Sequence, residues 1–311
     1  MSAKSPIAIS LNFDSLNEAY GFPPGYRDVS FFQAFDRVAN LAAAYGFRLS
    51  VYVIGKDLEN PEHAARVREW HAAGHEIGNH TWSHDYSLGS HAPEHVAREI
   101  EEAHVRLAAL TGEAPAGFIA PAWSTSKAVV RELVRLKYVY DTSVFPSVFL
   151  YPLVLKSLAS HAGNLRKGLT ILKRGDWHLP LVSPLEPYSV DAEFRRVAKG
   201  AKDSVLILPL PAPGRLQVCR WHTAGFFFGW DKHYAAVEKM AREREGFYYL
   251  IHPADFLGPE DLSAQHSQYL ERMDVPLAEK MRRLEDVFRL LKNSGRPAGT
   301  MRQKAEFLLK Q

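Results

Sequence analysis

The chain has a single cysteine, no long apolar run and no dense block of one charge among its 311 residues. Cys219 has no partner for an intrachain disulfide, which suits a reducing compartment. No stretch approaches the roughly 18 uninterrupted apolar residues of a membrane span. The first residues, MSAKSPIAIS, lack the charged and apolar regions of a secretory signal. We therefore expect a cytoplasmic protein, with membrane association as an alternative.

The charge balance gives no support for a polyanionic partner. The net charge is +3 and no Lys/Arg-rich stripe is present. We therefore expect no nucleic acid partner, which would favour a basic face. With 46% hydrophobic residues the chain can bury a sizeable core.

Strand and helix patterns alternate over the first 140 residues, which predicts a parallel sheet or barrel. Ile7, Ile9, Leu11 and Phe13 alternate with smaller or polar residues, a pattern typical of a strand. Its large apolar side chains should face outer helices, and Asn12 and Asp14 should share the opposite face. Further strands are predicted at 47–54, 75–78, 117–120, 138–141, 204–210 and 247–252, and helices at 31–45, 60–74, 93–110, 126–136, 233–244 and 273–291.

The chain divides into a predicted barrel over 1–262 and a helical extension over 263–311. The barrel contains an irregular, apolar insert at about 144–200. Residues 144–158 are unusually apolar for a loop, with several Lys and Arg residues downstream. One interpretation is peripheral contact with a membrane. The other, which we favour, is a segment packed on the barrel or in an oligomer contact.

His80 and His84 carry the strongest local signal for chemistry. They follow a short predicted strand, and residues four apart can face the same way on a helical turn. Imidazole is a good ligand for zinc and similar metals. Asp14, at the end of the first strand, is the natural acidic third ligand. Alternatively, the two are unrelated surface histidines, since the chain has 14.

Two further residues are weaker candidates for a site at the ends of the strands. His252 ends an apolar strand, where it could protonate a leaving amine. Trp123 lies in the loop after the strand at 117, where a sugar could stack on its ring. Each has a plain structural alternative, as a capping or buried histidine and as a core tryptophan.

In this order the motifs resemble those of the polysaccharide deacetylase family, also called the NodB-homology or carbohydrate esterase 4 family. The stretch from Gly74 to His84 is similar to the family's histidine box. The other resembling stretches are 53–58, 117–123, 141–146 and 250–253, so the resemblance covers roughly 6–146 and 204–257.

The resemblance implies an α/β fold, a distorted parallel (β/α) barrel of about seven strands. It implies a divalent metal, zinc first and cobalt or nickel as alternatives, held by Asp14, His80 and His84. It further implies that His252 protonates the leaving nitrogen of an N-acyl sugar, that Asp141 tunes His252, and that Pro121 and Trp123 bind substrate.

The first and third motifs depart from the family pattern. The family usually offers two carboxylates in the first motif, whereas this chain has one, Asp14. If the two are adjacent, Ser15 has replaced the metal ligand. If they are one residue apart, Asn12 has replaced the base, and the period-two pattern favours this second alignment. An arginine that usually orients the base corresponds to Ile119. Glu18 or the substrate itself would then have to serve as base.

Three functions remain as hypotheses. The first is a metal-dependent hydrolase that removes an acetyl or formyl group from an amino sugar, for example a nucleotide- or lipid-linked intermediate. The second is a catalytically inactive carbohydrate-binding protein, which the missing carboxylate and arginine favour. The third is a hydrolase of small amides, since a fold does not determine its substrate.

Overall fold

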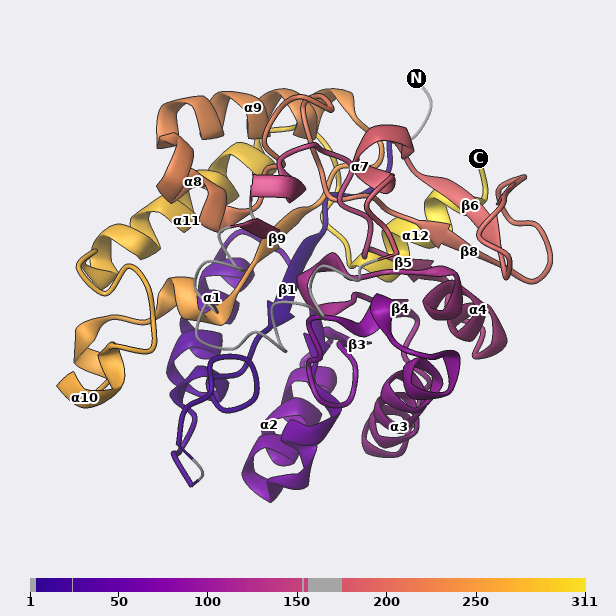
Figure 1. Ribbon diagram of the computed structural model, residues 1–311. Coiled ribbons are helices and arrows are strands. Elements are labelled where there is room, and N and C mark those ends of the chain that lie inside the picture. Colours follow the sequence, from indigo (N-terminus) through magenta and orange to yellow (C-terminus); the bar gives the residue numbers. More distant parts are fainter. Residues whose placement is uncertain (1–3, 24, 153, 156–174) are drawn as a thin grey trace.

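The central feature of the protein is one mostly parallel sheet, seen in a computed structural model that describes residues 4–23, 25–152, 154–155 and 175–311. Its strand order is β7-β6-β8-β5-β4-β3-β2-β1-β9. The strands from β8 to β9 in this order are all parallel, and helices lie around them (Figure 1).

The elements follow the predicted alternation closely up to residue 141. The strands are β1 (Ile9–Phe13), β2 (Leu49–Val53), β3 (Glu76–Asn79), β4 (Gly117–Phe118), β5 (Tyr140–Asp141), β6 (Tyr188–Asp191), β7 (Arg196–Val197), β8 (Ser204–Ile207) and β9 (Tyr249–Ile251). The α-helices are α1 (Gln33–Ala44), α2 (Pro61–Ala72), α3 (Pro93–Thr111), α4 (Lys127–Arg135), α7 (Leu179–Val182), α8 (His222–Phe228), α9 (Trp230–Glu243), α10 (Ala264–Ser267), α11 (Leu277–Lys292) and α12 (Met301–Leu309). Short 3-10 helices are η1 (Val29–Phe31), η2 (Gly55–Glu59), η3 (Leu88–Ser90), η4 (Pro121–Trp123), η5 (Pro253–Phe256) and η6 (Pro259–Asp261).

The predicted α/β fold with about seven parallel strands is confirmed, but the strands do not close into a complete barrel. Strand β6 pairs antiparallel with β8 and so takes the edge that closure onto β9 would need. Leu206 of β8 and Leu250 of β9 nevertheless pack in one apolar cluster. The insert at about 144–200, predicted to be irregular, contains a hairpin formed by β6 and β7.

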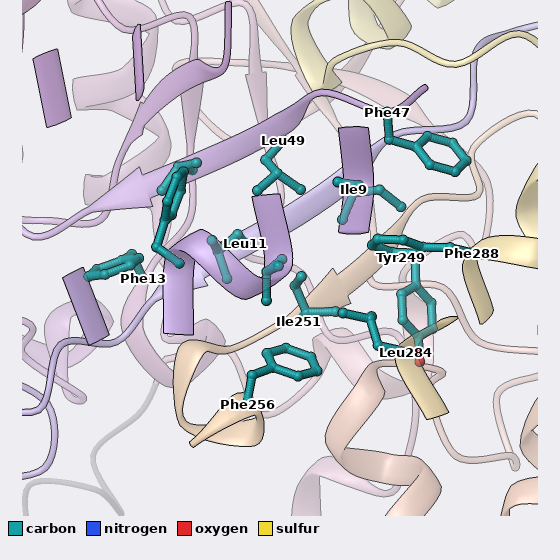
Figure 2. Close-up of a cluster of buried hydrophobic side chains, with 14 of the residues drawn as sticks. Ile9, Leu11, Phe13, Phe47, Leu49, Tyr249, Ile251, Phe256, Leu284 and Phe288 are labelled. Atoms are coloured by element: carbon teal, nitrogen blue, oxygen red, sulfur yellow. The ribbon is translucent and has the colours of Figure 1, made fainter. Parts of the chain in front are cut away.

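The two faces of β1 separate the core into an outer and an inner layer. Ile9, Leu11 and Phe13 are completely buried in the outer layer, which also contains Leu284 and Phe288 of α11 (Figure 2). Ala8 belongs instead to the inner cluster, together with Tyr52 and Leu250. This arrangement matches the alternation in the sequence, since successive side chains of a strand point to opposite faces.

The described part of the apolar segment 144–158 is largely packed against the inner cluster. Phe145, Leu150 and Val154 are buried there, whereas Leu155 is 64% exposed. Residues 153 and 156–158, and the basic residues expected downstream as far as 174, lie outside the described residues. Within the described ranges no helix is both long and apolar enough to cross a membrane.

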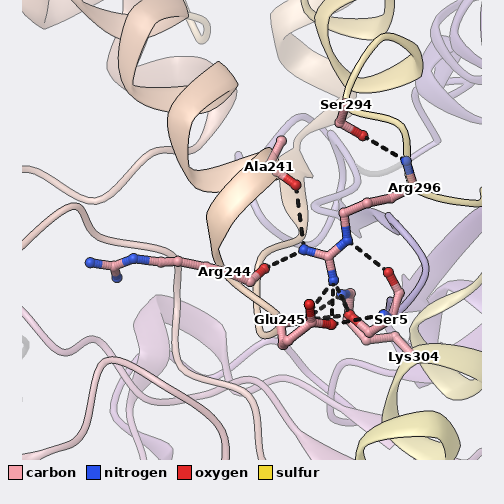
Figure 3. Close-up of polar contacts among 7 residues, drawn as sticks. All are labelled: Ser5, Ala241, Arg244, Glu245, Ser294, Arg296 and Lys304. Carbon is pink, nitrogen blue, oxygen red and sulfur yellow. Dashed lines mark hydrogen bonds and ion pairs between the residues drawn. The ribbon is translucent and has the colours of Figure 1, made fainter. Parts of the chain in front are cut away.

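The C-terminal extension is joined to the start of the chain by a buried polar network (Figure 3). The Arg296 side chain is fully buried and donates to the carbonyl oxygens of Ser5 at 2.8 Å and Arg244 at 2.6 Å. It also pairs with Glu245 at 2.8 Å. Lys304 of α12 donates to the Ser5 hydroxyl at 2.9 Å. These contacts hold α12 against the N-terminal end of β1.

We expect Arg296→Ala to lower the free energy of unfolding by about 3 kcal/mol, because removing one partner leaves the other buried groups uncompensated. Urea denaturation measures the loss. Arg282→Ala is the matched control, since Arg282 forms exposed pairs with Glu279 and Asp286. It should cost less than about 1 kcal/mol, and equal losses in the two variants would contradict a structural role for the network.

Candidate metal centre

The candidate site lies where neighbouring parallel strands end. Asp14 directly follows β1, His80 follows β3, and His252 follows β9. Because β3, β2, β1 and β9 are adjacent and parallel, these three residues come to the same edge of the sheet. Active sites of barrel folds are built at this edge.

Asp14 lies within hydrogen-bonding range of both His80 and His84. The Asp14 Oδ1 atom is 3.1 Å from His80 Nε2 and 3.3 Å from His84 Nε2. His252 Nε2 lies 4.0 Å from the other oxygen, Asp14 Oδ2. Both box histidines are buried, while the Asp14 side chain is 18% exposed at the open side of the group.

The histidine box forms an irregular turn, and not the helical turn expected from the spacing. Thr81 and His84 have left-handed backbone conformations, with φ of 67° and 58°. Asn79 Oδ1 accepts a hydrogen bond from the Thr81 amide at 2.7 Å, and Thr81 Oγ1 accepts one from the His84 amide at 3.2 Å. Glu99 of α3 accepts bonds from both the amide and the hydroxyl of Ser83. These local bonds replace the helical ones and turn both imidazoles toward Asp14.

The third motif orients His80 through its backbone. His80 Nδ1 lies 2.7 Å from the Ile119 carbonyl oxygen, so this nitrogen carries the proton and donates. Nε2 is then the ring nitrogen that faces Asp14 and is placed to ligate a metal. We had considered Ile119 only as the place of a missing arginine, because a backbone contact of this kind leaves no signal in the sequence.

The three donors fit a divalent metal of the zinc class. Donors around a tetrahedral zinc lie about 3.4 Å apart, close to the two separations from Asp14. Burial tends to raise the pKa of Asp14, but His84, His80 and His252 together hold it well below its usual range. Burial also lowers the pKa of His84. An ionised carboxylate and neutral imidazoles are the forms that bind metal.

Ser15 and Asn12 of the first motif have different surroundings. Ser15 is buried, and its hydroxyl accepts from the Glu18 amide at 3.2 Å and bonds to Asp57. Asn12 is buried on the same strand face as Asp14, and its Oδ1 has no hydrogen-bond partner in the described part of the chain. Glu18, the substitute base considered above, pairs with Lys56 at 2.9 Å. This placement agrees with the alignment in which Asn12 stands in for the base.

Asp141 has a different partner from the one expected. Its Oδ1 accepts from the amide of Ser143 at 2.9 Å and from the Ser143 hydroxyl, and no hydrogen bond or ion pair joins it to His252 among the described residues. The Ser143 hydroxyl in turn accepts from the Ala120 amide at 2.7 Å. Asp141 therefore braces the third motif, and does not contact the histidine that we expected it to tune.

The two expected substrate-binding residues lie in η4, at the end of β4. Pro121 is buried, and Trp123 is partly exposed with a left-handed φ of 52°. The Trp123 ring packs edge-on against Phe145 at 5.2 Å and Trp221 at 5.9 Å between centroids. One part of Trp123 thus belongs to an aromatic cluster, and the remaining surface is accessible.

The comparison with family models matches residues 3–140 to the polysaccharide deacetylases. Over these residues the chain is similar to the polysaccharide deacetylase family. The matched segment includes Asp14, His80, His84 and Trp123, whereas Asp141 and His252 lie beyond its end. The resemblance inferred from the motifs is therefore confirmed, and it supports a deacetylase activity in general terms.

Solved structures extend the likeness to the whole fold. A protein from Mycobacterium smegmatis assigned to the polysaccharide deacetylases is 13% identical, with a TM-score of 0.61 over 100% of this chain and 92% of that one. A carbohydrate esterase family 4 pseudoenzyme from Bacillus anthracis is 11% identical, with a TM-score of 0.50 over 98% and 66%. A mutant of that pseudoenzyme with restored activity is 11% identical, with a TM-score of 0.50 over 98% of this chain and 68% of that one. At these identities the likeness shows the fold alone, and no curated protein matches the sequence.

Asp141 should make the stability of the protein depend on pH. Burial raises its pKa to about 7, compared with about 3.9 in an unfolded chain. Its stabilising contribution is therefore complete below about pH 4 and is lost as the pH rises toward 7. Between about pH 4 and pH 7, the free energy of unfolding should fall more steeply in the wild type than in Asp141→Asn. The two slopes should differ by up to about 1.4 kcal/mol per pH unit.

Urea denaturation at several pH values measures this difference. Burial lowers the pKa of His222 to about 4 and of His233 to about 3, so these two histidines act in the opposite direction. They are present in both proteins, and subtracting the two profiles removes their effect. Parallel profiles would contradict a buried, protonated Asp141.

Proposed function

We propose that the protein is a metal-dependent hydrolase that removes an acetyl or formyl group from an amino sugar. The observation that carries the proposal is the convergence of Asp14, His80 and His84 on one point, in a chain similar to this family. These residues would hold the metal, zinc first among the candidates. A bound ion of this class supplies Lewis-acid activation of water and of the acyl carbonyl.

The remaining chemistry falls to the protein's own residues. His252 Nε2 is close to Asp14 Oδ2, and its side chain is 14% exposed on the open side of the site. We propose that it donates a proton to the leaving nitrogen, a role for which imidazole suits neutral pH. The exposed part of Trp123 is proposed to contact the sugar. Asn12 shares the face of Asp14 but cannot accept a proton as a carboxylate does.

A second candidate function is carbohydrate binding without catalysis. Asn12 and Ile119 occupy the positions of the usual base and its arginine, and Ile119 is completely buried in an apolar cluster. A protein of the same fold is described as a pseudoenzyme, and its mutant as having restored activity. These observations favour a site that retains its metal ligands and has a weakened or missing base.

Metal analysis of the tag-free protein tests the ligand set. We expect the double variant His80→Ala/His84→Ala to bind one equivalent of divalent metal fewer than the wild type. Its deacetylase activity should fall by more than the roughly 10–100-fold that the loss of an outer-shell partner costs. His104→Ala is the control, because His104 lies on α3 with its Nδ1 atom 3.1 Å from the Tyr138 hydroxyl and is not part of the Asp14 group. Equal metal content in the double variant and the wild type would refute the assignment.

Asn12→Asp tests whether a base is missing. It places a carboxylate on the face of Asp14, and we expect the rate on N-acetylated or N-formylated amino sugars to rise by about 100-fold, the lower end of the range for general-base catalysis. Asn17→Asp adds the same charge in the next loop, where Asn17 is bonded to the Tyr26 carbonyl, and should leave the rate unchanged.

The choice of substrates separates the candidate functions. The panel should contain free, nucleotide-linked and polymeric amino sugars beside small amides. Hydrolysis of the small amides but of none of the amino sugars would indicate a small-amide hydrolase. Sugar binding without turnover, in both the wild type and Asn12→Asp, would favour the binding protein.

A further inference from the structure

The loop between β3 and α3 carries a second group of metal-ligand side chains, Asp85, His91 and His95. Asp85 Oδ2 lies 2.7 Å from His91 Nε2 and 3.4 Å from His95 Nε2. The two imidazole centroids are 4.4 Å apart. We had not singled out these residues in the sequence, although His91 and His95 repeat the four-residue spacing of the histidine box.

Local structure prepares the three side chains for one another. Asp85 Oδ1 accepts from the Ser87 amide at 2.9 Å and from its hydroxyl at 2.7 Å, which leaves Oδ2 directed at the histidines. His91 lies between η3 and Pro93, the first residue of α3, and His95 is in the first turn of that helix. The carboxylate is thus oriented before any ion arrives.

The donor set matches the same class of metal as the Asp14 group. Both groups consist of two imidazole Nε2 atoms around one carboxylate oxygen. Of the two separations from Asp85, 3.4 Å already suits donors of a tetrahedral zinc, and 2.7 Å would have to widen by about 0.7 Å. The three side chains are 23–35% exposed, although the His95 Nε2 atom itself is covered.

The position of this group within the loop indicates what a metal there would do. His84 and Tyr86 face one way, with their rings in edge contact at 4.8 Å and His84 directed at Asp14. Asp85 and Ser87 face the other way, toward His91. An ion on the second group would therefore fasten the segment that carries His84 to the start of α3.

We propose that Asp85, His91 and His95 form a second divalent-metal site of the zinc class, with a structural role. The proposal is independent of the proposed function, because it concerns other ligands and requires no turnover. The site is more exposed than the Asp14 group, and it should bind zinc more weakly.

Zinc titration of the chelator-stripped, tag-free chain by calorimetry or equilibrium dialysis tests the proposal. We expect two equivalents for the wild type, one for His91→Ala/His95→Ala and one for His80→Ala/His84→Ala. His71→Ala is the matched control, because His71 is 30% exposed and has one carboxylate partner, Glu113 at 3.9 Å. It should keep both equivalents.

A second measurement avoids dependence on the folding of the double alanine variant. In the His80→Ala/His84→Ala background, zinc at about 100-fold above its Kd should raise the Tm by roughly 5 °C. Adding Asp85→Asn, which keeps an oxygen for Ser87 but removes the charge, should abolish most of this rise. No zinc-dependent rise in that background, or a rise unaffected by Asp85→Asn, would overturn the second site. Failure of the Asp14 site alone would lower the wild type to one equivalent, but it would leave both results in the His80→Ala/His84→Ala background unchanged.

Discussion

The register of the parallel strands β3, β2, β1 and β9 is the constraint on which the site depends. Phe13 pairs with Val53, and Val53 with Asn79, so the residues that follow Phe13 and Asn79 emerge at one level of the sheet. Those residues are Asp14 and His80. A shift of one residue in β1 would move Asp14 to the opposite face and bury a carboxylate among the apolar side chains of the outer layer. The completely buried Ile9, Leu11 and Phe13 oppose such a shift.

Backbone groups and local backbone conformation orient the side chains that the strand register brings together. The Ile119 carbonyl sets the tautomer of His80, and the left-handed residues of the histidine box turn His84 inward. The three proposed metal ligands are therefore brought together and held in place by the fold. In the alignment that the strand face favours, Asn12 and Ile119 stand where the family pattern usually has a carboxylate and an arginine. The two replacements are physically consistent, because a buried arginine without its carboxylate would be an uncompensated charge.

The outer parts of the chain hold the open barrel together. Strand β6 occupies the edge of β8, so the gap toward β9 is filled by side chains and not by backbone hydrogen bonds. On the opposite side, Arg296 and Lys304 tie the last helices to Ser5.

Local sequence patterns were sufficient for most helices and strands because they reflect local physics. Asn60 and Ser126 cap helices, Gly112 ends α3 in a left-handed conformation, and the alternation in β1 distinguishes its two faces. The grouping of Asp14 with the box histidines also followed from sequence, because parallel strands share an edge. The partners of Asp141, Ile119 and Arg296 could not be inferred in this way. Each depends on atoms that the chain brings together only after folding, and a backbone carbonyl or a buried hydroxyl leaves no pattern that spacing can detect.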